Sequence, residues 1–162
     1  MLAKSLVVYY SRTGTTAAVA QLIASGIGAE LEKIEDKKDR RGPIGALSTG
    51  KDVFLNKLAE IEQPKNDPSN YDLVIIGTPV WAGGLSLPVK AYILKFKQKF
   101  RSIAFFCTSG GFSSKNVLKD MAYLCGKEPV ATLSVSYLSY FTGGYKKNVA
   151  KFIKSISEPS TK

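Results

Sequence analysis

Four short, almost continuously apolar stretches constrain the fold of this chain more than any other feature of its sequence. They are SLVVYY (5–10), DLVIIG (72–77), SIAFFC (102–107) and VATLSVS (130–136). Runs of this length, rich in β-branched and aromatic residues, predict strands that are buried on both faces, as in a parallel sheet. A weaker stretch, AELEKIE (29–35), alternates only loosely and suits an edge strand. The sequence therefore predicts five strands.

Helical patterns separate these strands. Apolar residues recur at spacings of three and four within residues 16–27, 89–100, 117–124 and 149–156. A further helix is predicted over residues 51–63, where it ends before Pro64. Strands that alternate with helices are joined by right-handed crossovers into a parallel sheet with helices on both faces. We therefore expect a single α/β domain over residues 1–162, with a doubly wound, five-stranded parallel sheet.

The composition excludes several classes of function. The chain has no histidine, which removes the Ser-His and Cys-His nucleophile systems and the commonest metal ligand. Cys107 and Cys125 lack the spacing of metal ligands, so we expect two buried thiols in a reducing compartment. No metal site and no catalytic side chain are expected. With no run near the roughly 18–20 residues of a membrane span and no signal-peptide cleavage site, we expect a cytoplasmic protein without membrane insertion.

The chain is strongly basic, with a net charge of +10. Such an excess attracts nucleic acids, anionic membranes, acidic proteins or small polyanions. The basic residues are spread along helix-like faces, and the only dense cluster is KKDRR at 37–41. This distribution argues against a nucleic-acid partner. It is typical of a solvated basic surface, with an acidic partner as the alternative.

The segment SRTGTT (11–16) directly follows the first strand. In doubly wound sheets, ligands bind beyond the carboxyl ends of the strands. Four hydroxyl side chains, one glycine and the amides of the next helix form a donor set suited to a phosphate. The segment matches neither the Walker loop nor the Rossmann fingerprint. It is either a cradle for a phosphate monoester or an ordinary turn with a helix cap, and Arg12 either contacts the phosphate or points into solvent.

Two further segments are expected at the same edge of the sheet. GTPVWAGGLSLP (77–88) reads as a loop with the only tryptophan of the chain, Trp81, followed by glycines. Trp81 either covers a flat aromatic ligand or folds back over the end of the core. TSGGFS (108–113) is a glycine-containing turn. A phosphate cradle beside an aromatic wall specifies a ligand with a phosphate at one end and a planar ring at the other. Flavin mononucleotide (FMN) fits this shape, whereas NADP leaves a second phosphate without an evident site.

The pair of motifs S-x-T-G-[ST]-T and T-P-V-W-A-G resembles the flavodoxin-like family, in particular its short members that carry T-P-V-W-A-G. This resemblance covers nearly the whole chain and implies the strand order 2-1-3-4-5, with FMN at the point where the order reverses. It implies that the phosphate is bound by Ser11, Arg12, Thr13, Gly14, Thr15 and Thr16. It implies that the flavin ring is bordered by Pro79, Val80, Trp81, Ala82 and Gly83, and closed on its other side by Ser109, Gly110, Gly111 and Phe112.

The basic charge departs from the acidic electron carriers of this family. Positive surroundings stabilise the negative charge that a flavin gains on reduction, so we expect a less negative two-electron potential than in acidic relatives. The expected function is electron transfer through FMN to a redox partner protein, with an acidic protein as one option. The first alternative is an NAD(P)H-dependent FMN oxidoreductase of quinones or similar acceptors, with an aromatic wall in YLSYFTGGY (137–145). The second is a non-redox binding module. The basic segment 36–51 has no assigned role.

Overall fold

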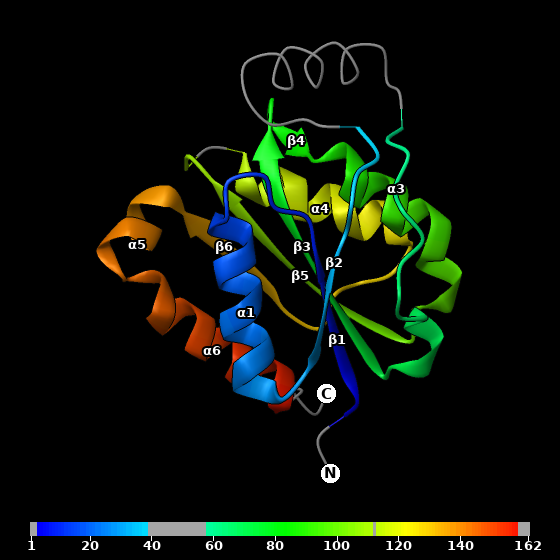
Figure 1. Ribbon diagram of the computed structural model, residues 1–162. Coiled ribbons are helices and arrows are strands. Elements are labelled where there is room, and N and C mark those ends of the chain that lie inside the picture. The colour runs from blue at the N-terminus through cyan, green and yellow to red at the C-terminus, as the bar shows by residue number, and fades with distance from the viewer. Residues whose placement is uncertain (1–2, 39–57, 112, 159–162) are drawn as a thin grey trace.

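The structure, a computed structural model, describes residues 3–38, 58–111 and 113–158. Five parallel strands form its sheet in the order β2-β1-β3-β5-β6 (Figure 1). These strands are β1 (Ser5–Tyr9), β2 (Glu30–Lys33), β3 (Leu73–Trp81), β5 (Ser102–Ser109) and β6 (Thr132–Ser136). Counted along the chain, they follow the order 2-1-3-4-5, so the predicted fold and strand order are confirmed. An additional short strand, β4 (Gly84–Leu85), pairs with β3 alone.

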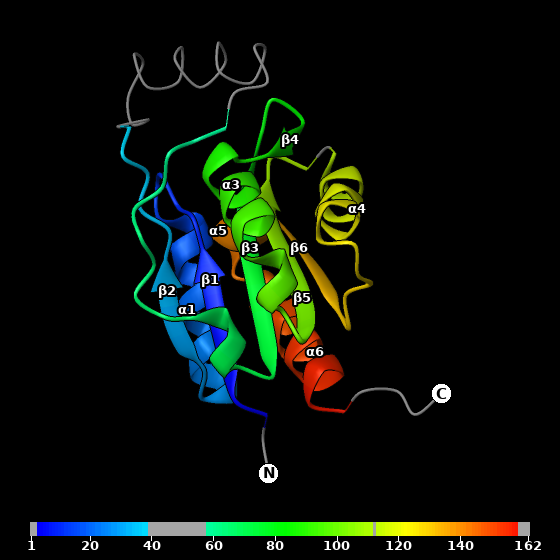
Figure 2. The same ribbon diagram turned by 90° about the vertical axis from the view of Figure 1, so that its right-hand side faces the viewer.

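Helices cover both faces of the sheet, which lies between them as the middle layer (Figure 2). Helices α1 (Thr15–Ile27) and α6 (Tyr145–Ser157) cover one face, and α3 (Leu87–Phe96) and α4 (Ser114–Cys125) cover the other. The shorter elements are η1 (Pro68–Asn70), η2 (Lys97–Lys99) and α5 (Tyr137–Thr142), the last of which links β6 to α6. Within the described residues, none of these helices has the length and apolar character needed to cross a membrane.

Side chains of the central strands alternate between two cores. In β1, Leu6 and Val8 pack with α3 and α4, whereas Val7 packs with α1 and α6. All three are fully buried, which explains why this strand is continuously apolar rather than alternating. Cys107 and Cys125 are both buried and both free thiols, as the sequence predicts.

Strand β3 extends beyond the predicted strand at 72–77. The prediction of a loop over 77–88 is therefore wrong for its first residues, because the backbone stays extended as far as Trp81. It then turns and returns as β4, with Val80 opposite Leu85 and Trp81 opposite Gly84. An antiparallel hairpin gives the projecting end of the strand backbone partners that the parallel sheet no longer supplies.

The prediction of a helix over 51–63 is wrong for residues 58–63, which are not helical. Residues 51–57 lie outside the described part of the chain. Ile61 forms an antiparallel bridge with Asp36. The amide of Glu62 donates to the carbonyl oxygen of Glu35 at 2.8 Å. The amide of Lys37 donates to the carbonyl oxygen of Glu60 at 3.0 Å. These hydrogen bonds pair residues 60–62 with the segment after β2. Tertiary contacts of this kind commonly override the helix propensity of a sequence. Most of the basic segment 36–51 also lies outside the described residues.

Candidate functional site

A cleft of about 270 Å³ lies at the carboxyl ends of the strands. It is bordered by the turn after β1, the end of β3, the end of β5 and the helix α5. The lining residues are Arg12, Thr13, Thr15, Thr16, Pro79, Trp81, Thr108, Tyr137 and Phe141. Six of these nine belong to the predicted cofactor-binding set, so the first two predicted segments do meet at one cleft.

The turn after β1 positions the N-terminus of α1 at this cleft. Gly14 is the residue before the helix and has φ 101°, a left-handed value that favours glycine. Its amide donates to the Ser11 hydroxyl at 3.1 Å, which closes the turn. No side chain caps α1 and its first turn holds no acidic residue. The amides at this helix end and the hydroxyls of Thr13 and Thr15 therefore remain available to an anion.

Thr16 differs from the other hydroxyl residues of the turn. It is buried, and its Oγ1 lies 2.8 Å from Oγ1 of Thr108 at the end of β5. This hydrogen bond joins α1 to β5 under the cleft. Thr108 was not among the predicted site residues, although it is the first residue of TSGGFS (108–113), a segment that the sequence places at this edge of the sheet.

The hairpin β3–β4 forms the second wall of the cleft. Its two turn residues, Ala82 and Gly83, have φ 48° and 76°. Positive φ at both central residues is the geometry of a type I′ turn, which suits the twist of a two-residue hairpin. The amide of Ser86 donates to the hydroxyl of Thr78 at 3.0 Å across the base of the hairpin, and both side chains are buried. Thr78 therefore holds the predicted ring-binding segment in place, a role that the sequence did not indicate.

Trp81 packs on the core and also lines the cleft. It is half-buried against the cluster of side chains between the sheet and α3. The Tyr10 ring meets it edge-on, with 5.4 Å between ring centroids and an interplanar angle of 88°. The guanidinium carbon of Arg12 lies 4.7 Å from the centroid of the indole. Arg12 thus packs on Trp81, an arrangement that neither of its sequence-based alternatives included.

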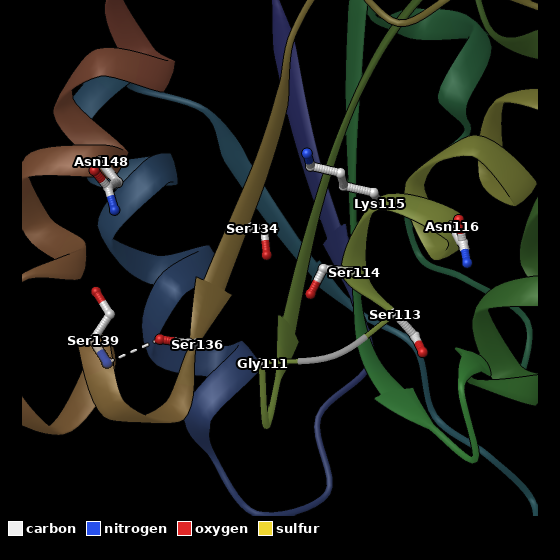
Figure 3. A pocket seen from close by; sticks show the side chains of 9 residues that line it. All are labelled: Gly111, Ser113, Ser114, Lys115, Asn116, Ser134, Ser136, Ser139 and Asn148. Atoms are coloured by element: carbon white, nitrogen blue, oxygen red, sulfur yellow. Dashed lines mark hydrogen bonds between the residues drawn. The ribbon is translucent and has the colours of Figure 1, made fainter.

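Of the third predicted segment, TSGGFS (108–113), Thr108 lines this cleft, whereas Ser109, Gly110 and Gly111 do not. The Ser109 and Ser114 hydroxyls are 2.7 Å apart, and the amide of Gly111 donates to Ser109 at 3.2 Å. Gly110 is exposed, and Phe112 lies outside the described residues. Gly111 borders a second hollow of about 480 Å³, in which Ser114, Ser134, Ser136 and Ser139 lie around the space between α4, β6 and α5 (Figure 3).

The remaining predicted residues, Ser11, Gly14, Val80, Ala82 and Gly83, support the walls of the cleft rather than line it.

The segments that follow β1, β3, β5 and β6 carry positive charge at the edge of the cleft. These segments are residues 10–16, 82–87, 110–116 and 137–145. The charged side chains among their described residues are Arg12 and Lys115. No carboxylate occurs in these segments. An anionic ligand in the cleft would therefore meet favourable charge from Arg12 and no acidic side chain among the nine lining residues.

Cys107 is the nearest thiol to the cleft along the chain, next to Thr108. Burial raises the pKa of this thiol, against the opposing effect of hydrogen bonds with Ser134 and Ser114. A buried, protonated thiol is a poor nucleophile, because the thiolate is the reactive form. Cys107 is therefore a poor candidate for a nucleophile at this cleft.

Solved structures with the same arrangement are flavoproteins. A flavoprotein from Lactobacillus acidophilus, solved in complex with FMN, is 29% identical, with 82% of this chain and 93% of that chain covered and a TM-score of 0.72. The chain has a flavodoxin-like fold. Oxidised Flavodoxin 2 from Bacillus cereus has the same fold, with 16% identity, coverage of 96% and 98%, and a TM-score of 0.60.

Sequence comparison adds one curated relative of this flavodoxin-like protein. An NAD(P)H dehydrogenase (quinone) from Cupriavidus metallidurans is 27% identical over 92 residues, which are 57% of this chain and 46% of the relative. The match thus spans less than half of that protein. No protein-family model matches the chain.

Proposed function

We propose that this chain is an FMN-binding redox protein that carries electrons as flavodoxins do. The cleft supports this proposal most directly, because it joins a phosphate-type donor set to an aromatic wall. The amides at the start of α1 and the hydroxyls of Thr13 and Thr15 suit a phosphate monoester. Pro79 and Trp81 on one wall, with Tyr137 on another, suit a planar ring. These residues fit FMN, the ligand of the Lactobacillus acidophilus flavoprotein.

When bound, FMN supplies reversible electron transfer, and the chain holds and surrounds it. The turn at 11–16 binds the phosphate end and the hairpin borders the ring. The hydrogen bond between Thr16 and Thr108 holds the start of α1, next to this turn, against the end of β5. The nine lining residues include no cysteine, histidine or carboxylate, and we assign them the roles of binding and positioning the flavin.

We further propose that electrons pass to an acidic protein that docks beside α5. Leu138 and Phe141 are 75% and 79% exposed on this short helix, and Phe141 also lines the cleft. The sequence from residue 129 to 157 contains four lysines and no carboxylate. An apolar patch with a basic surround suits an acidic partner, since opposite charge steers association. The free, buried thiols of Cys107 and Cys125 are consistent with a cytoplasmic location.

The second candidate function is NAD(P)H-dependent reduction of quinones or similar acceptors. The relative from Cupriavidus metallidurans, an NAD(P)H dehydrogenase (quinone), favours it. Tyr137 and Phe141 line the cleft from α5 and offer aromatic surface to a second planar molecule. Steady NAD(P)H oxidation by the purified protein, with a quinone as the only other reactant, would favour this candidate over the carrier.

The deciding experiment is the visible spectrum of the purified protein, together with the mass of any ligand released from it, before and after FMN is added. The proposal expects a bound flavin whose mass includes one phosphate. A colourless protein that binds no FMN after reconstitution would overturn it, and a non-redox binding module would then be the better description of the fold.

A further inference from the structure

Arg12 stands in the turn expected to bind phosphate, yet its side chain packs on the wall expected to border the ring. Its guanidinium carbon lies 4.7 Å from the centroid of the Trp81 indole, within the range of a cation–π contact. Trp81 is held in turn by the edge of Tyr10. The arginine is therefore anchored on a fixed aromatic surface and committed to the hairpin side of the cleft.

Arg12 is also the only charged residue among the nine that line the cleft. No ion pair joins it to a carboxylate of the described residues, and the described residues of 82–87, 110–116 and 137–145, which follow β3, β5 and β6, include no acidic residue. Arginine keeps its charge at any working pH. A positive charge that no described carboxylate pairs with thus lies in a partly enclosed cleft, where screening by water is weaker than on an open surface.

The phosphate end of the cleft does not need this side chain. Thr13, Thr15 and the amides at the start of α1 already form a donor set there. Reduction, by contrast, adds negative charge to a flavin ring, and a nearby fixed cation stabilises that charge. The position of Arg12 on Trp81 therefore serves the ring better than the phosphate.

We propose that Arg12, held on Trp81, is a ring-side residue that raises the reduction potential of the bound flavin and adds nothing to recognition of its phosphate. This inference rests on the proposed function, because it concerns how the same cleft treats FMN. It reverses the assignment of Arg12 to the phosphate-binding set that the family resemblance implies.

The test compares Arg12→Gln and Arg12→Lys with Lys115→Gln, a matched control that removes a positive charge from the same edge without touching Trp81. Three quantities are measured: the fluorescence of the apoprotein, the dissociation constants of FMN and riboflavin, and the two-electron potential of the FMN complex. Because Trp81 is the only tryptophan, fluorescence reports the contact with Arg12 in the absence of any flavin.

We expect Arg12→Gln to change the Trp81 emission, to make the potential more negative and to change the dissociation constants of FMN and riboflavin by the same factor, less than about fivefold. Arg12→Lys should fall between the wild type and Arg12→Gln, and Lys115→Gln should leave the emission unchanged. A loss of roughly tenfold for FMN but not for riboflavin, with an unchanged potential, would identify Arg12 as a phosphate ligand and overturn the proposal.

An unchanged Trp81 emission in Arg12→Gln would also overturn the proposal, because it would show that the contact is not formed. Failure of the wild type to bind either flavin would instead defeat the proposed function. The two failures are distinguishable because the emission is measured without a ligand.

Discussion

The Thr16 and Thr108 hydroxyls lie 2.8 Å apart beneath the cleft, although 92 positions separate them in the sequence. Both side chains are buried, so neither hydroxyl can exchange its partner for bulk water. The bond joins the first turn of α1 to the end of β5, two of the elements that border the cleft. It fixes the position of the proposed phosphate-binding turn relative to the sheet.

Replacing either of these threonines with valine should destabilise the protein. Each single variant leaves one buried hydroxyl without its partner, which costs about 1–3 kcal/mol of the free energy of unfolding. The double variant should lose less than the sum of the two single variants, since no unpaired hydroxyl remains. Urea denaturation of the four proteins measures this coupling. Strictly additive losses would show that the hydroxyls do not interact.

The hairpin turn predicts a second effect, on stability. Gly83 has φ 76°, and a side chain there is strained, so Gly83→Ala should lower the free energy of unfolding by about 1–2 kcal/mol. Gly110, which has an ordinary φ and open space at its Cβ position, is the matched control, and Gly110→Ala should be close to neutral. Thermal denaturation compares the two variants. Equal effects at both positions would contradict the strain argument.

The proposed phosphate cradle predicts a selective loss of affinity. Thr15 lines the cleft at the first position of α1, and Thr15→Val keeps its shape while removing its hydroxyl. We expect FMN to bind about three- to tenfold more weakly and riboflavin, which lacks the phosphate, to bind as before. Ser25→Ala, at an exposed position near the other end of α1, serves as the control. Equal weakening of both flavins would place Thr15 at the ring instead.

The pH dependence of stability should include a contribution from Asp67, which caps η1. A hydrogen bond from Lys99 at 2.7 Å, followed by those from the Ser69 amide and hydroxyl, lowers the pKa of this carboxyl from 3.8 to about 2. A lowered pKa in the folded state stabilises the protein above pH 3.8, and this stabilisation is lost as the pH falls towards 2.

Asp67→Asn should therefore flatten the fall in stability between about pH 4 and pH 2, without changing its course above neutrality. The effect is expected to be small, because the carboxyl is exposed and salt screens the pair with Lys99. Chemical denaturation at a series of pH values measures it. A profile of the variant that parallels the wild type throughout would refute this assignment.

The sequence by itself determined the alternation of strands and helices and, through its two family motifs, the order of the strands. The continuously apolar runs and the periodic helices are local patterns, and burial on both faces of a sheet imposes them directly on the sequence. The turn at 11–16 was likewise placed correctly at the start of a helix, because its residue types suit only a few conformations.

Tertiary structure decided how these local elements meet. It extended β3 to Trp81, because the hairpin with β4 supplied partners for the backbone beyond the sheet. It replaced a predicted helix near residue 61 with a bridge to Asp36. It also placed Arg12 on Trp81 and Thr16 on Thr108. Apart from the hairpin, these contacts join residues far apart in the chain, and they form only when the packed sheet brings them together, so no local pattern in the sequence records them.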